Sequence, residues 1–240
     1  MSGFQGLPMP ASFTGFGEKA LPFFKALKFH MSRDWFQENR DLYDSHVLAP
    51  FSALIEAVNA ACIAKGLPMR GTPKSALFRI HRDVRFAKDK RPYKTHAGAV
   101  MTRSGAKNDP GLTYIHISPE GCFAAVGFYD LEPKQLAAFR QAIIAVPERF
   151  RAMSAELAAA GLAFDPQWSL KRPPREAAGI EDADLVAALK LKSIVVKRPL
   201  PDTLIRSPQL VDACTGLIED ALPLLDFGWS ALAALAPERG

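Results

Sequence analysis

Residues 114–128, YIHISPEGCFAAVGF, decide the fold class of this chain. Apolar side chains dominate two short runs, from Tyr114 to Ile117 and from Cys122 to Phe128, which is typical of β-strands with one buried face. Between them stands Ser118-Pro-Glu-Gly121, whose proline and glycine favour a tight turn. Strands joined in this way are antiparallel, so the sequence predicts an antiparallel sheet at its centre.

The alternating pattern extends outward from this hairpin. Ala97, Ala99 and Met101 predict a further strand, joined to the hairpin by a longer turn over 103–111. Two more strands are predicted over 78–86 and 191–197. Helical spacing, helix caps and prolines predict helices over 21–29, 32–47, 50–66, 133–145, 147–161, 184–190 and 207–225, the last interrupted near Pro223. The fold class is therefore α+β, a central, mostly antiparallel sheet flanked by N-terminal and C-terminal helices.

Length and composition fit one globular domain. The chain has 240 residues, 48% hydrophobic and 23% charged, which excludes disordered and collagen-like classes. Residues 1–12 are predicted to be a loose arm and residues 13–240 a single α+β domain. The three cysteines are dispersed, which argues against a disulfide framework and fits a reducing compartment. No apolar run approaches the roughly 18 residues of a membrane span, so we expect a cytoplasmic protein without a membrane partner.

Positive charge is concentrated in one segment. Residues 70–107 hold 11 basic and two acidic residues, a net charge of +9. The other 202 residues hold 19 basic and 23 acidic residues, a net charge of −4. The formal charge of +5 therefore comes from one short cationic region, which favours an anionic ligand there.

Within this region, a strand over 78–86 has two different faces. Alternation assigns Phe78, Ile80, Val84 and Phe86 to one face, and Arg79, His81, Asp83 and Arg85 to the other. Arg82 falls on the apolar face, where a guanidinium needs a carboxylate or carbonyl partner. The run from Ala87 to Pro92 is predicted to be a loop, with Tyr93 as a peripheral wall beside it.

These residues suggest a site for a phosphate or carboxylate group. Arginine forks match two anionic oxygens at once, and lysine adds a point charge. The candidate anion-binding residues are Arg79, Arg82, Arg85, Lys90, Tyr93, Lys94 and Lys192. The candidate catalytic residues, for proton transfer, are Asp83, Asp89 and His81. Lys192 belongs to a second basic group over 171–198, which would extend the site if its strand lay beside 78–86.

The same segment carries a family resemblance. Arg79-Ile-His-Arg82-Asp83-Val-Arg85-Phe86-Ala-Lys-Asp89-Lys90-Arg-Pro-Tyr93 resembles the signature R-x-x-R-D-x-R-F-x-x-x-[DN]-K-x-x-Y of the DUF2461 family. The resemblance extends more loosely over residues 13–229, including Arg33-Asp34-Trp35-Phe36. His30-Met31, where that family has an Asn pair, and Ala87, where it usually has Ser, depart from it. The resemblance implies an α+β domain and the place of a site, and it implies no reaction.

Three functions stay open from the sequence. The first is binding of a phosphorylated small molecule or nucleotide, with catalysis undecided. The second is a nucleic-acid-binding protein that uses the same basic face, with aromatic side chains stacking on bases. The third is a structural network of Arg–Asp ion pairs in a protein-interaction module. No metal site is predicted from the histidine spacing, and the cofactor and the oligomeric state are left unassigned.

Overall fold

A four-stranded antiparallel sheet forms the centre of the protein in the computed structural model, which describes residues 12–86, 88–233 and 235. The strands are β1 (Ala97–Thr102), β2 (Leu112–Ile117), β3 (Phe123–Phe128) and β4 (Ile194–Pro199), in the order β1-β2-β3-β4. Ala99 pairs with Ile115 across β1 and β2, and Val126 pairs with Val196 across β3 and β4. The α+β prediction is confirmed.

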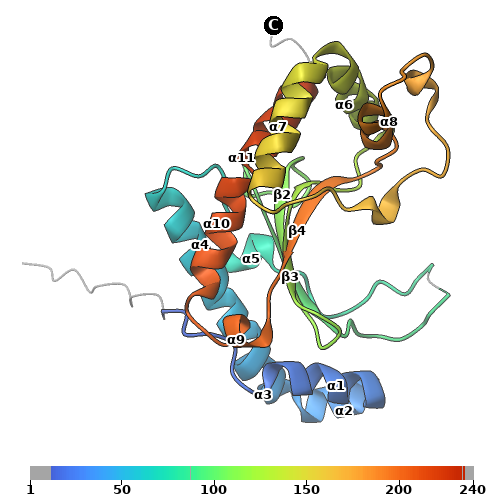
Figure 1. The fold of residues 1–240 in the computed structure, drawn as a ribbon. Helices are drawn as coiled ribbons and strands as arrows, with labels where there is room; N and C mark the ends of the chain where they lie inside the picture. The colour runs from blue at the N-terminus through green and yellow to red at the C-terminus, as the bar shows by residue number, and fades with distance from the viewer. Residues whose placement is uncertain (1–11, 87, 234, 236–240) are drawn as a thin grey trace, which may run out of the picture.

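A series of helical segments precedes the sheet. They are α1 (Ala20–His30), α2 (Arg33–Glu38), α3 (Arg40–Tyr43), the π-helical turn η1 (Asp44–Leu48), α4 (Ala49–Ala64) and α5 (Pro73–Ala76). Ser32 caps α2 by accepting a hydrogen bond from the Trp35 amide at 3.2 Å, as predicted. The helices α1 and α2 lie side by side below the sheet (Figure 1).

The remaining helices follow β3 and β4. They are α6 (Pro133–Ala145), α7 (Pro147–Ala159), the 3₁₀ turns η2 (Pro166–Trp168) and η3 (Arg175–Ala177), α8 (Ala183–Leu189), α9 (Asp202–Ile205), α10 (Leu210–Asp220) and α11 (Leu222–Ala233). The predicted helix 207–225 is divided between α10 and α11, because Pro223 stands at the second position of a new helix, where its missing N–H costs no helical hydrogen bond.

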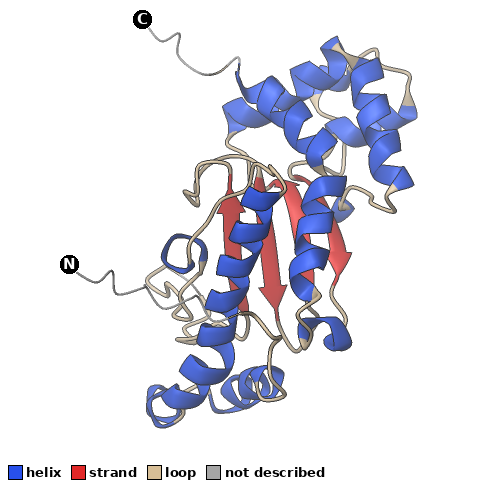
Figure 2. Ribbon diagram, turned by 90° about the vertical axis from the view of Figure 1, so that its left-hand side faces the viewer, coloured by secondary structure: helices blue, strands red, loops and turns tan. Residues whose placement is uncertain are grey.

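The core lies between the sheet and the helices on one of its faces. Figure 2 shows α4 and α10 running across that face. Leu54 and Ile55 of α4, Leu217 of α10 and Val126 of β3 have no exposed surface. The stretch Arg40–Ala64 is long and apolar enough to cross a membrane by length and composition alone. One third of its apolar window is buried, and its α4 part packs against α10.

Two sequence predictions about strands need correction. The strand predicted at 191–197 begins only at Ile194, after a bend at Lys192 and Ser193. No strand forms over the described residues of 78–86, where His81 makes an isolated bridge to Tyr93, and Leu77, just before them, makes one to Ala99. The loose arm is predicted for residues 1–12, and residues 1–11 lie outside the part of the chain that the structure describes. Cys62, Cys122 and Cys214 are buried free thiols.

Candidate functional site

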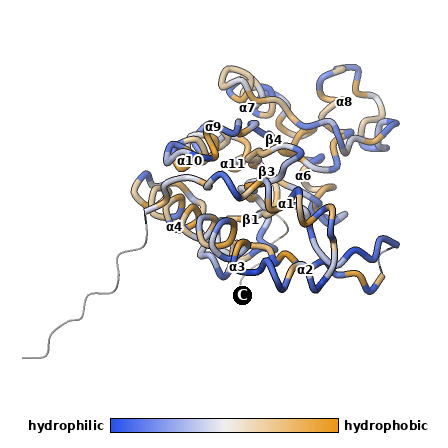
Figure 3. Tube along the Cα trace, turned by 90° about the horizontal axis from the view of Figure 1, so that it is seen from below, coloured by the Kyte–Doolittle hydropathy of each residue, from blue (hydrophilic) through white to orange (hydrophobic). Residues whose placement is uncertain are grey.

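The cationic segment forms an irregular hairpin over residues 77–96, which we call the basic hairpin. Its two arms are joined by hydrogen bonds from the Arg82 amide to the Pro92 carbonyl at 2.9 Å and from the Lys94 amide to the Ile80 carbonyl at 2.8 Å. The first arm meets the outer edge of β1 through the Leu77–Ala99 bridge. The hairpin projects from the body in Figure 1, and Figure 3 shows its outer part as mostly hydrophilic.

The hairpin does not have the two faces of a regular strand. Ile80 is buried, as predicted, but Phe78 is 39% exposed and Phe86 is 95% exposed. Pairing ends at Arg82 and Pro92, and beyond them Asp83 and Asp89 accept hydrogen bonds from backbone amides two residues ahead. Such local side-chain to backbone bonds compete with strand pairing, which explains why the alternation fails here.

Both aspartates of the hairpin are bound by arginines. Asp83 pairs with Arg85 at 2.7 Å, and Asp89 pairs with Arg82 and Arg91, each at 2.6 Å. Hydrogen bonds from Arg85 lower the pKa of Asp83, and those from Arg91 and Arg82 hold the pKa of Asp89 far below its ordinary value. Carboxylates held ionised in this way are weak proton acceptors, so the geometry does not favour the predicted proton-transfer role of Asp83 and Asp89.

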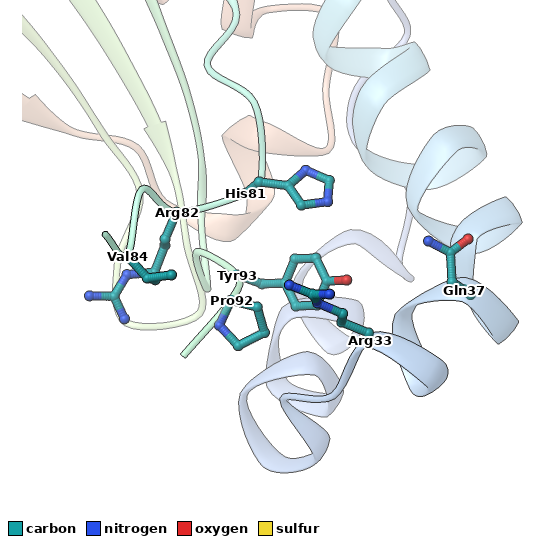
Figure 4. Close-up of a pocket in the computed structure, with 7 residues that line it drawn as sticks. All are labelled: Arg33, Gln37, His81, Arg82, Val84, Pro92 and Tyr93. Atoms are coloured by element: carbon teal, nitrogen blue, oxygen red, sulfur yellow. The ribbon is translucent and has the colours of Figure 1, made fainter. Parts of the chain in front are cut away.

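A pocket of about 310 Å³ lies between α2 and the basic hairpin, and we call it the α2–hairpin pocket. It is lined by Arg33, Gln37, His81, Arg82, Val84, Pro92 and Tyr93. Figure 4 shows the Arg33 guanidinium near the Tyr93 ring, with His81 above them and the Arg82 guanidinium turned away. Three of the predicted site residues therefore line one pocket, together with two residues of α2.

Tyr93 forms the floor of this pocket. It is 3% exposed, and its ring stacks on Phe36 with centroids 4.5 Å apart. The sequence prediction of a peripheral Tyr93 is therefore wrong, because the second arm of the hairpin packs onto α2. Within the described part of the chain, the side chains of Arg33, Gln37, His81 and Tyr93 form no hydrogen bond or ion pair.

A second pocket, of about 270 Å³, lies on the other side of His81, toward η1. Arg79 of the hairpin and Arg40 of α3 line it, and Arg40 pairs with Asp44 at 3.3 Å. The other carboxylate oxygen of Asp44 is buried and has no hydrogen-bond partner among the residues that the structure describes. This pocket is largely apolar otherwise, with Phe36, Tyr43, Leu48, Leu77, Phe78 and Ile80 in its walls.

The other predicted anion-binding residues lie elsewhere. Arg85 stands at the hairpin tip, where the Lys90 ammonium donates to the Val84 carbonyl at 3.0 Å. Lys94 reaches the Arg79 carbonyl at 3.1 Å on the sheet side. Lys192 precedes β4, which is the outer strand at the edge opposite β1. The strand that follows Lys192 therefore does not lie beside the hairpin, so the condition under which the second basic group would extend the site is not met.

Arg33 and Gln37 are the pocket residues that sequence reasoning did not assign. Arg33 belongs to the Arg33-Asp34-Trp35-Phe36 stretch of the resemblance, which was the available signal. The sequence pattern around Arg33 does not indicate that it lies near His81 and Tyr93, about fifty to sixty positions later. Among the residues that the structure describes, no three His, Cys, Asp or Glu side chains gather as a metal site would require.

Comparison with family models identifies a family that covers most of the chain. Residues 19–227 match the family described as "Conserved hypothetical protein (DUF2461)". No curated protein and no solved structure matches the chain. The family match spans most of the chain, including α2 and the whole basic hairpin, so both walls of the α2–hairpin pocket lie inside it. The chain therefore belongs to the DUF2461 family.

Proposed function

We propose that this protein binds a small phosphorylated molecule in the α2–hairpin pocket. The observation that carries the proposal is the set of unpaired polar groups at Arg33, Gln37, His81 and Tyr93 around one cavity, all of them within the described residues. A guanidinium, an amide, an imidazole and a phenol together offer several N–H and O–H donors. Donors that converge without internal acceptors suit an anion rich in oxygen.

The size and position of the pocket limit the ligand. A volume of about 310 Å³ is at the lower end of the range of small-molecule sites, about 300–1,000 Å³. It suits a monophosphate of modest size better than a dinucleotide. Arg33, Gln37 and His81 are exposed, so the ligand can enter from solvent without a change in the fold. Tyr93 is held rigidly by Phe36, which fixes the floor on which the ligand would rest.

Arg82 has a supporting role in this proposal. Its guanidinium pairs with Asp89 and turns away from the cavity. The pair joins the first arm of the hairpin to the outer loop, and so holds His81 near Tyr93. The network of Arg–Asp pairs is then structural at the hairpin tip, while binding takes place at its base.

Calorimetric titration tests the proposal. The probes are inorganic phosphate and a panel of sugar and nucleoside monophosphates. We expect at least one of them to bind, and Arg33→Gln to weaken that binding about 10- to 100-fold, because a charge-assisted hydrogen bond is worth about 1.5–3 kcal/mol. Tyr93→Phe should weaken binding less, since it removes one neutral donor.

Arg85→Gln is the matched control. It makes the same charge change as Arg33→Gln, but on the basic hairpin and outside the pocket. The proposal fails if no member of the panel binds the folded protein. It fails equally if Arg85→Gln weakens binding as much as Arg33→Gln, because the hairpin charge and not the pocket would then attract the anion.

A further inference from the structure

The sheet has a second face, opposite the one on which α4 and α10 pack, and its aromatic side chains are partly exposed. Register places Tyr114 opposite Val100 and Ala125, and His116 opposite Gly98 and Phe123. These residues alternate with the buried Ile115 and Ile117, so they point away from α4 and α10. In Figure 1 the helices α4, α10 and α11 lie on one side of the sheet, and the basic hairpin projects on the other side.

Five aromatic rings form a connected array on this second face, and we call it the aromatic face. Its members are Phe78, His96, Tyr114, His116 and Phe123, all at least partly exposed. His116 stacks on Phe123 with centroids 4.8 Å apart and lies 4.5 Å from His96. Tyr114 lies 5.9 Å from Phe123 and 6.4 Å from Phe78. The array thus crosses from the hairpin to β3.

Tyr114 is held close to the sheet. Its hydroxyl lies 2.9 Å from Nδ1 of His116. Its ring lies over Gly98 of β1, where an added Cβ would come within 2.7 Å of the hydroxyl oxygen. A larger residue at position 98 would therefore push the ring outward, so this glycine lets the ring approach β1. Neighbouring rings are inclined to one another, from 20° between His116 and Phe123 to 61° between Phe78 and Tyr114, so the exposed rings offer stacking surfaces in more than one direction.

Three cations lie at the Phe78 end of the array. The ammonium groups of Lys94 and Lys107 each lie 5.2 Å from the centre of the Phe78 ring. They donate to the carbonyls of Arg79 and Leu77, and each keeps protons for further bonds. Within the described part of the chain, neither lysine nor Arg79 pairs with a carboxylate. Burial, Arg79 and Lys107 together lower the pKa of Lys94. Because no carboxylate in the described part of the chain pairs with these three cations, their positive charge is available to an anion from outside the chain.

We propose that the aromatic face binds single-stranded nucleic acid, with bases stacked on its rings and phosphates on Arg79, Lys94 and Lys107. Stacking is available to every unpaired base, and the lysines supply the backbone contacts that single strands need. Strands lie about 4.8 Å apart, so the span from the hairpin to β3 is roughly 14 Å, enough for two to three nucleotides. A duplex hides its base faces and would meet only the cations.

Fluorescence anisotropy with a labelled dT12 oligonucleotide tests this proposal. We expect dT12 to bind at 50 mM salt at least 10-fold more tightly than a 12-base-pair duplex. Phe123→Leu should weaken dT12 binding about 5- to 100-fold at every salt concentration, since it removes a stacking surface. The double variant Lys94→Gln, Lys107→Gln should reduce the slope of log affinity against log salt by about 1.4, because each phosphate contact on a single strand contributes about 0.7.

The matched control is the double variant Lys25→Gln, Lys134→Gln, on exposed positions of α1 and α6. It makes the same charge change away from the sheet and should keep the wild-type slope. The proposal is overturned if dT12 does not bind, or if the duplex binds equally well. A slope reduced equally in the control would also overturn it, because general charge would then explain the attraction.

Discussion

Tyr93 shows at the level of one residue how the basic hairpin is anchored. Its ring stacks on Phe36 of α2 and lies 5.2 Å from the His81 ring, while its hydroxyl has no hydrogen-bond partner in the described structure. We therefore expect Tyr93→Ala to lower the free energy of unfolding by about 3–5 kcal/mol, as for other buried aromatic truncations. Tyr93→Phe should change it by less than about 0.5 kcal/mol.

Urea unfolding of the two variants measures this difference. Tyr93→Phe is the control, because it keeps the ring and removes only the hydroxyl. Equal stability of the alanine and phenylalanine variants would mean that the hairpin does not pack on α2. The α2–hairpin pocket would then not exist in solution, whatever the hydroxyl contributes to ligand binding.

The charged residues of the hairpin divide into two groups. Asp83 and Asp89 accept ion pairs from Arg82, Arg85 and Arg91, and these pairs are at least partly exposed. Exposed pairs contribute little to stability, so their role is to shape the loop locally. Arg79 has no such partner in the described structure and faces the second pocket. The ion pairs at the tip of the hairpin fit the hypothesis of a structural network. Arg79, near the base of the hairpin, fits the hypothesis of ligand binding.

At the level of elements, the basic hairpin differs most from the sequence prediction. Alternation predicts Phe86 on a buried strand face with Ile80, whereas Phe86 is 95% exposed and Ile80 is 5% exposed. Phe86→Ala should therefore change the free energy of unfolding by no more than about 0.5 kcal/mol. Ile80→Ala should lower it by about 2–5 kcal/mol, because it leaves a cavity next to α2.

Thermal and urea unfolding of these two variants decide between a hairpin and a buried strand. Comparable large losses from both substitutions would favour the strand. A small loss from both would mean that neither side chain packs against the body of the protein, which would contradict the burial of Ile80.

Local patterns were sufficient for most elements and insufficient for the site. The hairpin 114–128 was predictable because alternation and a Pro-Gly turn act over neighbouring residues. Over 78–86 the same alternation predicts a strand that does not form. Asp83, and Asp89 just beyond this segment, accept hydrogen bonds from the backbone amides two residues ahead, and these bonds compete with strand pairing. Arg33 joins His81 and Tyr93 only through packing of α2 on the hairpin, a contact between distant segments that no local pattern encodes.

At the scale of the whole molecule, the net charge of +5 conceals two separate basic regions. The segment 70–107 lies along the β1 edge, and Lys192 lies by the outer strand β4. Two different candidate surfaces accompany the first region, a small pocket between α2 and the hairpin and the aromatic face on the sheet. In the two proposals, size and donor geometry select the ligand of the pocket, and stacking selects the ligand of the aromatic face.

Stability of the whole molecule should depend on pH through the aromatic face. Burial, with His96 close by, lowers the pKa of His116 to about 4 from 6.5, although Glu120 opposes this effect. In the unfolded chain His116 takes up a proton below about pH 6.5, whereas in the folded protein it stays neutral down to about pH 4. The stabilisation is therefore fully present above pH 6.5 and is lost as the pH falls from 6.5 to 4.

His96 contributes to the same pH dependence, since burial and the nearby Lys94 lower its pKa as well. Because both rings are partly exposed, we expect a discounted loss of about 1–2 kcal/mol from His116 across this window. Urea unfolding at pH 7.5, 6, 5 and 4 measures it in the wild type and in His116→Gln. The variant cannot take up this proton, so its stability should fall less steeply between pH 6.5 and 4. Identical pH profiles would show that His116 is solvated in the folded protein, and that the aromatic face is looser than its stacked rings indicate.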